Sequence, residues 1–199
     1  MIVHTLTLNR WSPRAACDVI DWYEMHRTLE NHRPDHDVRL LFRVEPIAIE
    51  SPIATVIVTN EDRPMDWSGL EDGYLSSPVE QVDIPTVLPT GATVAWKLRI
   101  NPCRSHHGHR IIRAAETDQI TIDLLERNGL LVHELALEQR AVKTMMRRHC
   151  RGDKPRPLTH AIACGTAEVT DPTRLSAALL NGVGDERHLG CGLLTIRTL

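Results

Sequence analysis

The sequence has few aromatic residues, no long apolar run and no paired-cysteine motif, and each absence excludes a class of protein. Phe, Trp and Tyr together make up 4% of the 199 residues, so Val, Ile and Leu must form most of the core. No segment approaches the roughly 18 apolar residues of a membrane helix, and Met1–Leu8 alternates, so we expect neither membrane insertion nor a signal peptide. The five cysteines lack CxxC spacing, which predicts reduced thiols in the cytoplasm rather than a disulfide framework or zinc ribbon.

Two common signatures of cofactor-dependent enzymes are also missing. The chain contains no GxxxxGK[ST] loop and no HExxH helix, which argues against a P-loop NTPase and a zincin. His106-His107-Gly-His109 is rich in histidine, but no cysteine or carboxylate stands at ligand spacing, so a zinc site is the less favoured interpretation. We therefore expect neither a cofactor nor a metal.

The net charge of −3 hides a strong asymmetry along the chain. Residues 1–96 hold 7 basic and 15 acidic side chains, whereas residues 97–156 hold 13 basic and 7 acidic ones. Seven of these basic residues lie within Arg140–Arg156, against the single acid Asp153. Such a block is typical of a surface that binds a phosphate backbone, although a solvated loop has the same composition.

Alternating apolar residues and turn signals divide the chain into strands and helices. Ser12-Pro13 supplies an N-cap and a first-turn proline for a helix, and Gly129 is a C-terminal glycine for another. The expected helices are Pro13–Asn31, Thr117–Asn128 and one that starts at Asp171-Pro172 and ends before Gly182. The expected strands are Val3–Leu8, Arg39–Glu45, Ile53–Thr59, Val79–Ile84, Ala92–Ile100, Leu130–Leu137, Thr144–Cys150, Leu158–Val169 and Leu193–Leu199.

This order predicts an α+β fold made of two ferredoxin-like (RRM-like βαββαβ) domains in tandem. We expect the first domain at residues 1–85 and the second at residues 92–199, joined by the linker Pro85–Gly91. The acidic stretch Asn60–Ser77 is expected to be irregular or to form one short helix, and Asn101–Arg113 to be a mobile basic loop. The basic residues before Pro157 should form the tip of a β-hairpin in the second domain.

Four sequence elements resemble one family. The segment Gly182-Val-Gly-Asp-Glu-Arg-His-Leu-Gly-Cys-Gly-Leu-Leu194 resembles the C-terminal glycine signature of CasE, the crRNA-processing endoribonuclease of type I-E CRISPR systems and a member of the repeat-associated mysterious protein (RAMP) superfamily. Arg99-Ile-Asn-Pro102 resembles that family's strand end. Tyr23-Glu-Met-His26 and Leu40–Glu45 are similar to its first-helix element and second strand.

The resemblance implies a function and partners. It implies cleavage of CRISPR repeat RNA (pre-crRNA) at the base of its stem-loop without a metal, and retention of the crRNA product with the other subunits of Cascade. Cleavage without a metal leaves a 2′,3′-cyclic phosphate and a 5′-hydroxyl, because the nucleophile is the 2′-hydroxyl of the RNA itself. An acidic first half is consistent with docking against protein in such a complex.

The candidate catalytic residues are His26 and Tyr23. Residues three apart share one face of a helix, and an imidazole with a pKa of about 6.5 can act as base or acid near neutral pH. The role of His26 as base or acid stays open, and Tyr23 is either catalytic or a packing residue. The expected RNA contacts are basic residues and the glycines of the signature: Arg27, Lys97, Arg99, Arg104, Arg147, Arg148, Arg151, Lys154, Arg156, Arg187, Gly182, Gly184, Gly190 and Gly192.

Two other functions compete with this hypothesis. A non-catalytic RNA-binding scaffold of the same superfamily would use the glycine loop to hold RNA, and His26 would be structural. A metal-dependent or metabolic enzyme on a ferredoxin-like scaffold would need added metal and would show no preference for hairpins. We rank the endoribonuclease first, the scaffold second and the metabolic enzyme third.

Overall fold

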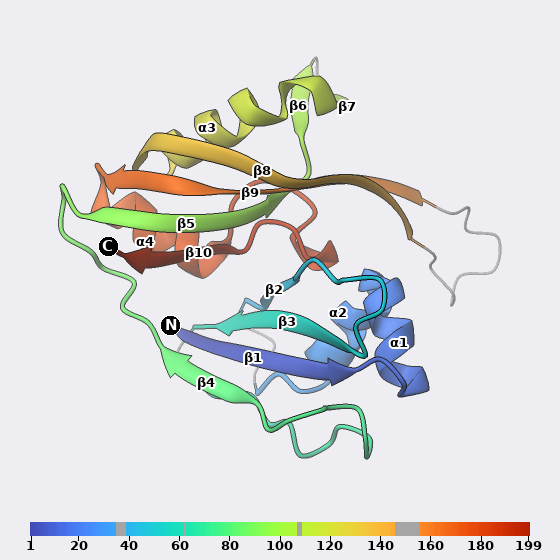
Figure 1. Cartoon of the computed structure of the whole chain (residues 1–199). Helices are drawn as coiled ribbons and strands as arrows, with labels where there is room; N and C mark the ends of the chain where they lie inside the picture. Colours follow the sequence, from blue (N-terminus) through green and yellow to red (C-terminus); the bar gives the residue numbers. More distant parts are fainter. Residues whose placement is uncertain (35–38, 62, 107–108, 146–155) are drawn as a thin grey trace. The chain divides into compact units, whose positions relative to one another are not determined.

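The computed structural model describes residues 1–34, 39–61, 63–106, 109–145 and 156–199 (Figure 1). The chain forms two compact units that do not follow the chain order strictly. The first unit contains Met1–Ile84, His188–Gly190 and the described residues of Thr144–Arg156. The second contains Pro85–Lys143, Pro157–Arg187 and Cys191–Leu199. A short segment of the C-terminal glycine loop therefore belongs to the N-terminal unit.

The first unit is built on a four-stranded antiparallel sheet in the order β2-β3-β1-β4. This is the strand order of a ferredoxin-like fold, with the second helix replaced by turns and a bridge between Leu8 and Leu75. The irregular structure expected for Asn60–Ser77 is confirmed for its described residues after β3. The elements are β1 (Ile2–Asn9), α1 (Pro13–Ile20), α2 (Trp22–Glu30), β2 (Leu41–Val44), β3 (Ile53–Asn60) and β4 (Glu80–Asp83).

The single helix expected over Pro13–Asn31 is wrong, because the chain breaks it at Asp21. Asp21 has an extended backbone, with φ −117° and ψ 103°, so it ends α1 and begins α2. Its carboxylate accepts a hydrogen bond of 3.0 Å from the amide of Tyr23, as a favourable N-cap does. Tyr23 and His26 consequently lie on a separate helix of nine residues.

The second unit is a βαββαβ fold with the strand order β10-β5-β9-β8. Helix α4 starts at the predicted Asp171 cap and ends at Gly182, and Gly129 follows α3 with φ 85°, so both predicted ends are confirmed. The main elements are β5 (Thr93–Ile100), α3 (Thr117–Arg127), β8 (Leu130–Met145), β9 (Arg156–Val169), α4 (Pro172–Asn181) and β10 (Leu194–Thr198). Short 3-10 turns, η1 and η2, span Ala114–Glu116 and Arg187–Leu189.

Two expectations for the second unit need correction. Asn101–Arg113 is not a simple loop, because β6 (Cys103–His106) and β7 (His109–Ile112) pair antiparallel within it. The separate strands expected at Leu130–Leu137 and Thr144–Cys150 are one long strand, β8, up to Met145. Residues 146–155, the predicted hairpin tip, lie outside the described residues.

Aliphatic side chains form most of the core of each unit, as the scarcity of aromatic residues predicts. Leu6, Val56 and Val58 are fully buried in the first unit, and Leu98 and Ile162 are fully buried in the second. Together with the two antiparallel sheets, these cores confirm the predicted α+β fold class. Among the described residues, no helix is long and apolar enough to cross a membrane.

Candidate functional site

Helix α2 presents a half-buried stripe formed by Tyr23, His26 and Glu30. Positions i, i+3 and i+7 of an α-helix lie on one side, so these three side chains share a face. The helix is anchored by Met25 and Leu29, which are almost completely buried. The stripe is therefore held at the border between the core and solvent, where a side chain can both be positioned and meet a substrate.

The ring of His26 lies close to two rings from distant parts of the sequence. Its ring is stacked against that of Phe42, with the centroids 6.4 Å apart and the planes at 16°. The ring of His188, from the glycine loop, meets it edge-on at 6.2 Å and 68°. The Nδ1 atom of His26 is buried and has no hydrogen-bond partner among the described residues, whereas 24% of the side chain stays exposed.

A charged pair formed by the last residue of α2 and a residue three positions later lies beside His26. One carboxylate oxygen of Glu30 lies 3.7 Å from Nε2 of His26, and the other lies 3.0 Å from Arg33 Nη2. Burial lowers the pKa of His26 below its ordinary value, and His188 and Arg33 lower it further, whereas Glu30 acts in the opposite direction. The imidazole is therefore neutral at pH 7 and able to accept a proton.

The glycine loop approaches His26 through the segment His188–Gly190, which belongs to the first unit. Gly190 has φ 73°, and a Cβ atom added there would lie 2.9 Å from Cε2 of Phe42. Only glycine combines this backbone conformation with so close a contact. Gly190 thus allows the loop to lie against the ring that stacks on His26.

The other signature glycines build the loop in the second unit. The amide of Gly182 donates to Ala178 and ends α4, and the amide of Gly192 donates to the carbonyl of Arg99 at 2.7 Å. These two amides are used within the protein, and contact of RNA with the signature glycines stays a prediction from sequence. Gly184 has φ 76° and is half-buried.

Arg187 is also engaged by the loop itself. Its Nε donates to the carbonyl of Gly184 at 2.9 Å, and its Nη1 donates to the carbonyl of Asn181 at 3.0 Å. Asn181 is the last residue of α4, whose carbonyl has no partner within the helix. These bonds cap α4 and hold the guanidinium of Arg187 within the loop that carries His188, and the phosphate contact expected of Arg187 stays a prediction.

The other described RNA-contact candidates differ in exposure. Arg27 pairs with the buried Glu24 at 3.4 Å while its side chain stays 46% exposed, so it can also meet a phosphate. Lys97 pairs with Glu138 at 2.8 Å and is less exposed. Arg99 is 1% exposed inside the second unit, which argues against the direct contact expected of it.

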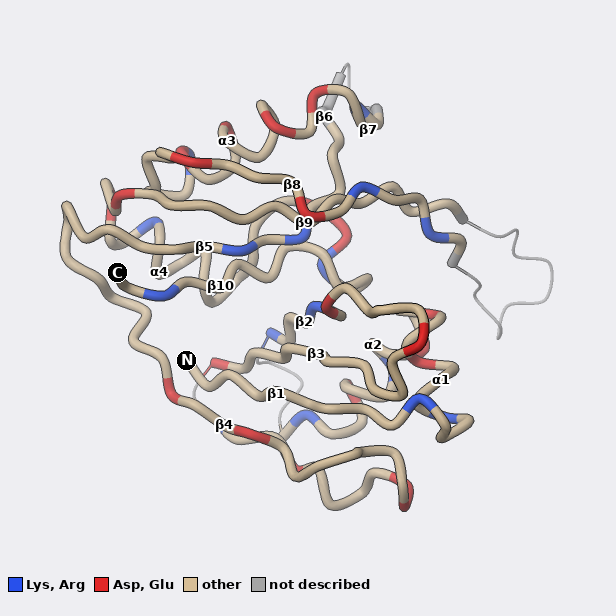
Figure 2. Tube along the Cα trace, in the orientation of Figure 1, with Lys and Arg blue, Asp and Glu red and all other residues tan. Residues whose placement is uncertain are grey.

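Most of the residues of the predicted basic hairpin lie outside the described residues. Arg147, Arg148, Arg151 and Lys154 lie outside the described residues, and for Arg104 and Arg156 only the backbone is described. Figure 2 shows basic positions on β5 and in the C-terminal part of β8, and acidic positions on β4. The role of the hairpin residues stays a prediction from sequence.

Sequence reasoning missed four residues around His26: Glu30, Arg33, Phe42 and His188. The spacing of His26 and Glu30, four residues apart on a helix, was a usable signal because such pairs meet. Phe42 and His188 carry no comparable signal, since only the tertiary fold brings them to α2. The site therefore contains a second imidazole that local patterns do not reveal.

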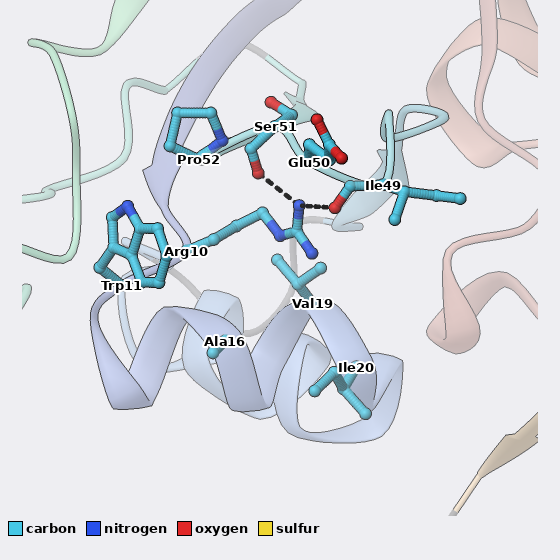
Figure 3. A pocket seen from close by; sticks show the side chains of 9 residues that line it. All are labelled: Arg10, Trp11, Ala16, Val19, Ile20, Ile49, Glu50, Ser51 and Pro52. Carbon is cyan, nitrogen blue, oxygen red and sulfur yellow. Dashed lines mark hydrogen bonds between the residues drawn. The ribbon is translucent and has the colours of Figure 1, made fainter.

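The first unit also has a surface pocket away from this stripe (Figure 3). Arg10 is one of its lining residues and donates to backbone carbonyls of Ile49 and Ser51. Its volume of about 220 Å³ is below the roughly 300 Å³ of common small-molecule sites. None of the residues of the α2 stripe lines it. Its lining residues are Arg10, Trp11, Ala16, Val19, Ile20, Ile49, Glu50, Ser51 and Pro52.

Known proteins resemble this chain over its whole length. The family model described as CRISPR associated protein matches residues 1–198. The CRISPR-associated endoribonuclease Cse3 of Thermus thermophilus is 32% identical over 210 residues, which covers 96% of this chain and 97% of that protein.

Solved structures agree with this similarity. Thermus thermophilus Cse3 bound to an RNA representing a pre-cleavage complex superposes with a TM-score of 0.84 at 28% identity, over 98% of each chain. Cas6e from Escherichia coli superposes with a TM-score of 0.69 over 100% of each chain, and its 20% identity supports the fold alone. The CasE resemblance seen in the sequence is confirmed, and the chain belongs to the CRISPR associated protein family.

Proposed function

We propose that this chain is a metal-independent endoribonuclease that cleaves CRISPR repeat RNA at the base of its stem-loop and retains the product hairpin as a subunit of Cascade. One observation carries the proposal: His26, held neutral and half-buried, lies on the helix that matches the CasE element. The 32% identity to an endoribonuclease that has been solved with RNA supports the same conclusion.

The RNA supplies the nucleophile for this reaction. The 2′-hydroxyl oxygen beside the scissile phosphate attacks phosphorus and forms the O2′–P bond, and the P–O5′ bond breaks. The products are a 2′,3′-cyclic phosphate and a 5′-hydroxyl. The protein has to align the attack, move one proton from O2′ and one to O5′, and stabilise the charge on phosphorus.

Residues of α2 can meet these needs. A neutral His26 can take up a proton, and its exposed edge faces solvent. Tyr23, on the same stripe, can donate from its hydroxyl to a phosphate oxygen. The partly exposed guanidinium of Arg27 can stabilise the phosphate, because its pairing with Glu24 leaves part of it accessible.

The basic hairpin is proposed to hold the RNA stem. An A-form stem is recognised through its shape and backbone, and a narrow hairpin can enter its deep groove near the stem's end. Arginine there can also pair with the edge of a guanine. The cluster consists of Arg147, Arg148, Arg151, Lys154 and Arg156, and Lys97 and Arg104 would add backbone contacts.

A non-catalytic scaffold is the second candidate. The stacking of His26 on Phe42 and its contact with Glu30 are also what a structural histidine makes. In that case the chain would bind the stem-loop and leave it intact.

The chemistry predicts both the conditions and the products of cleavage. Incubated with a CRISPR repeat stem-loop in excess EDTA, the protein should cut it once, because neither proton transfer nor attack needs a metal. The 5′ fragment should resist phosphatase until acid opens its cyclic phosphate, and the 3′ fragment should accept a label from polynucleotide kinase without prior dephosphorylation.

Two kinds of outcome would contradict the proposed function. Cleavage that appears only after Mg²⁺ is added, or a 5′ fragment ending in a free 3′-hydroxyl, contradicts the proposed chemistry. Binding without cleavage, seen as a stable shifted band of intact RNA, supports the scaffold instead.

A further inference from the structure

His188 is the second titratable ring of the candidate site. It is exposed, it stands on η2 within the glycine loop, and its ring centre lies 6.2 Å from that of His26. Both residues belong to the same compact unit. Because a hydrogen bond spans about 3 Å, one phosphate group beside this pair can be within reach of both rings.

The surroundings of the pair disfavour protonation of both rings at once. Two imidazolium ions at this distance repel each other, so each ring disfavours a second proton on its neighbour. Glu30 lies beside His26 at the end of the same helix, Arg33 pairs with Glu30 from the residues that follow, and the uncharged ring of Phe42 stacks on His26. Burial lowers the pKa of His26, which is therefore the neutral ring, whereas His188 is exposed to solvent.

We propose that His188 is a second catalytic histidine, which donates a proton to the leaving 5′ oxygen while His26 accepts the proton of the 2′-hydroxyl. This inference rests on the proposed function. The O2′–P bond forms as the P–O5′ bond breaks, one proton moves from O2′ to His26, and one moves from His188 to O5′. After cleavage, His26 releases its proton to water and His188 takes up a proton from water, so both rings regain their starting states.

The contacts of the residues beside His188 are consistent with a general acid whose position is fixed. The guanidinium of Arg187, the preceding residue, is fixed by two backbone carbonyls. Gly190, at the other end of His188–Gly190, packs against Phe42. The backbone on both sides of His188 is therefore held in place, which is what proton transfer over a short distance requires.

A substrate with sulfur in place of the leaving 5′ oxygen tests this assignment. A thiolate leaves without being protonated, so an acid variant should be slow only on the ordinary RNA. We expect His188→Gln to lower the single-turnover rate on the oxygen substrate by about 10²-fold or more, and to cleave the sulfur substrate within a few-fold of the wild-type rate. His26→Ala should be slow on both substrates.

Controls separate the possible failures. His133→Gln, which changes a half-exposed histidine of β8, should alter neither rate. An RNA affinity and a melting temperature close to those of the wild type should show that His188→Gln is folded. An unchanged rate on the oxygen substrate, or equal losses on both substrates, overturns the role of His188 as acid. If His26→Ala is also fully active, the catalytic role proposed for His26 fails as well. If only His26→Ala is inactive, that role stands and only the inference about His188 falls.

Discussion

Replacement of His26 by alanine should lower the single-turnover cleavage rate of a repeat stem-loop by about 10²- to 10⁴-fold, the usual contribution of a positioned proton carrier. The physical reason is that no other described group on the stripe of α2 is a neutral imidazole, and the 2′-hydroxyl is a poor nucleophile until its proton is removed. The affinity for the stem-loop should change little, since the basic hairpin is untouched. Quenched-flow or manual quench kinetics with excess enzyme measures the rate, and a filter-binding titration measures the affinity.

Two further variants sharpen this test. Tyr23→Phe removes one hydroxyl from the same stripe, so a slow variant makes Tyr23 catalytic and an unchanged one makes it a packing residue. His133→Ala controls for the loss of a histidine outside the site. Cleavage by His26→Ala within a few-fold of the wild-type rate would make His26 structural.

Replacement of Gly192 by alanine should destabilise the protein by about 2–5 kcal/mol. The residue has φ 83°, which costs an L-residue about 1–2 kcal/mol. The new Cβ would also lie 2.7 Å from the carbonyl oxygen of Val183, and overpacking of this kind costs about 1–3 kcal/mol. A backbone oxygen cannot swing away as a side chain does, so the loop itself must move. Urea denaturation measures the change in the free energy of unfolding.

Gly91 provides the matched control in the same unit. It has φ 84°, but a Cβ added there meets no described atom within 4 Å. Gly91→Ala should therefore cost only the backbone strain, about 1–2 kcal/mol. Equal losses of unfolding free energy in the two variants would contradict the importance of the close contact at Gly192. Glycine would then be needed there only for its positive φ.

The fold was largely predictable because its signals are local. The alternation of apolar residues located the strands, and the caps at Ser12 and Asp171 located two helix starts. The break at Asp21 was missed because the apolar spacing continues across it, although Asp is a favourable N-cap. Pairing of β6 with β7 was missed because glycine and histidine in that segment resemble a loop.

The site was predictable only in part. His26 could be found from a motif on one helix, whereas Phe42 and His188 meet it through tertiary folding. The exposure of basic side chains could not be predicted either. The charge of Arg99 and Arg187 suggested phosphate contacts, yet Arg99 is buried and Arg187 caps α4. Charge in a sequence does not show whether a guanidinium is turned towards solvent or towards backbone carbonyls.

The central claim is that the attacking oxygen comes from the RNA, and one atomic deletion in the substrate tests it. A repeat stem-loop with a single 2′-deoxy nucleotide just upstream of the cut should bind as tightly as the all-ribose RNA and remain intact after prolonged incubation with the wild-type protein. Cleavage of that RNA at the same bond would contradict the account, because a nucleophile other than the 2′-hydroxyl would then be at work.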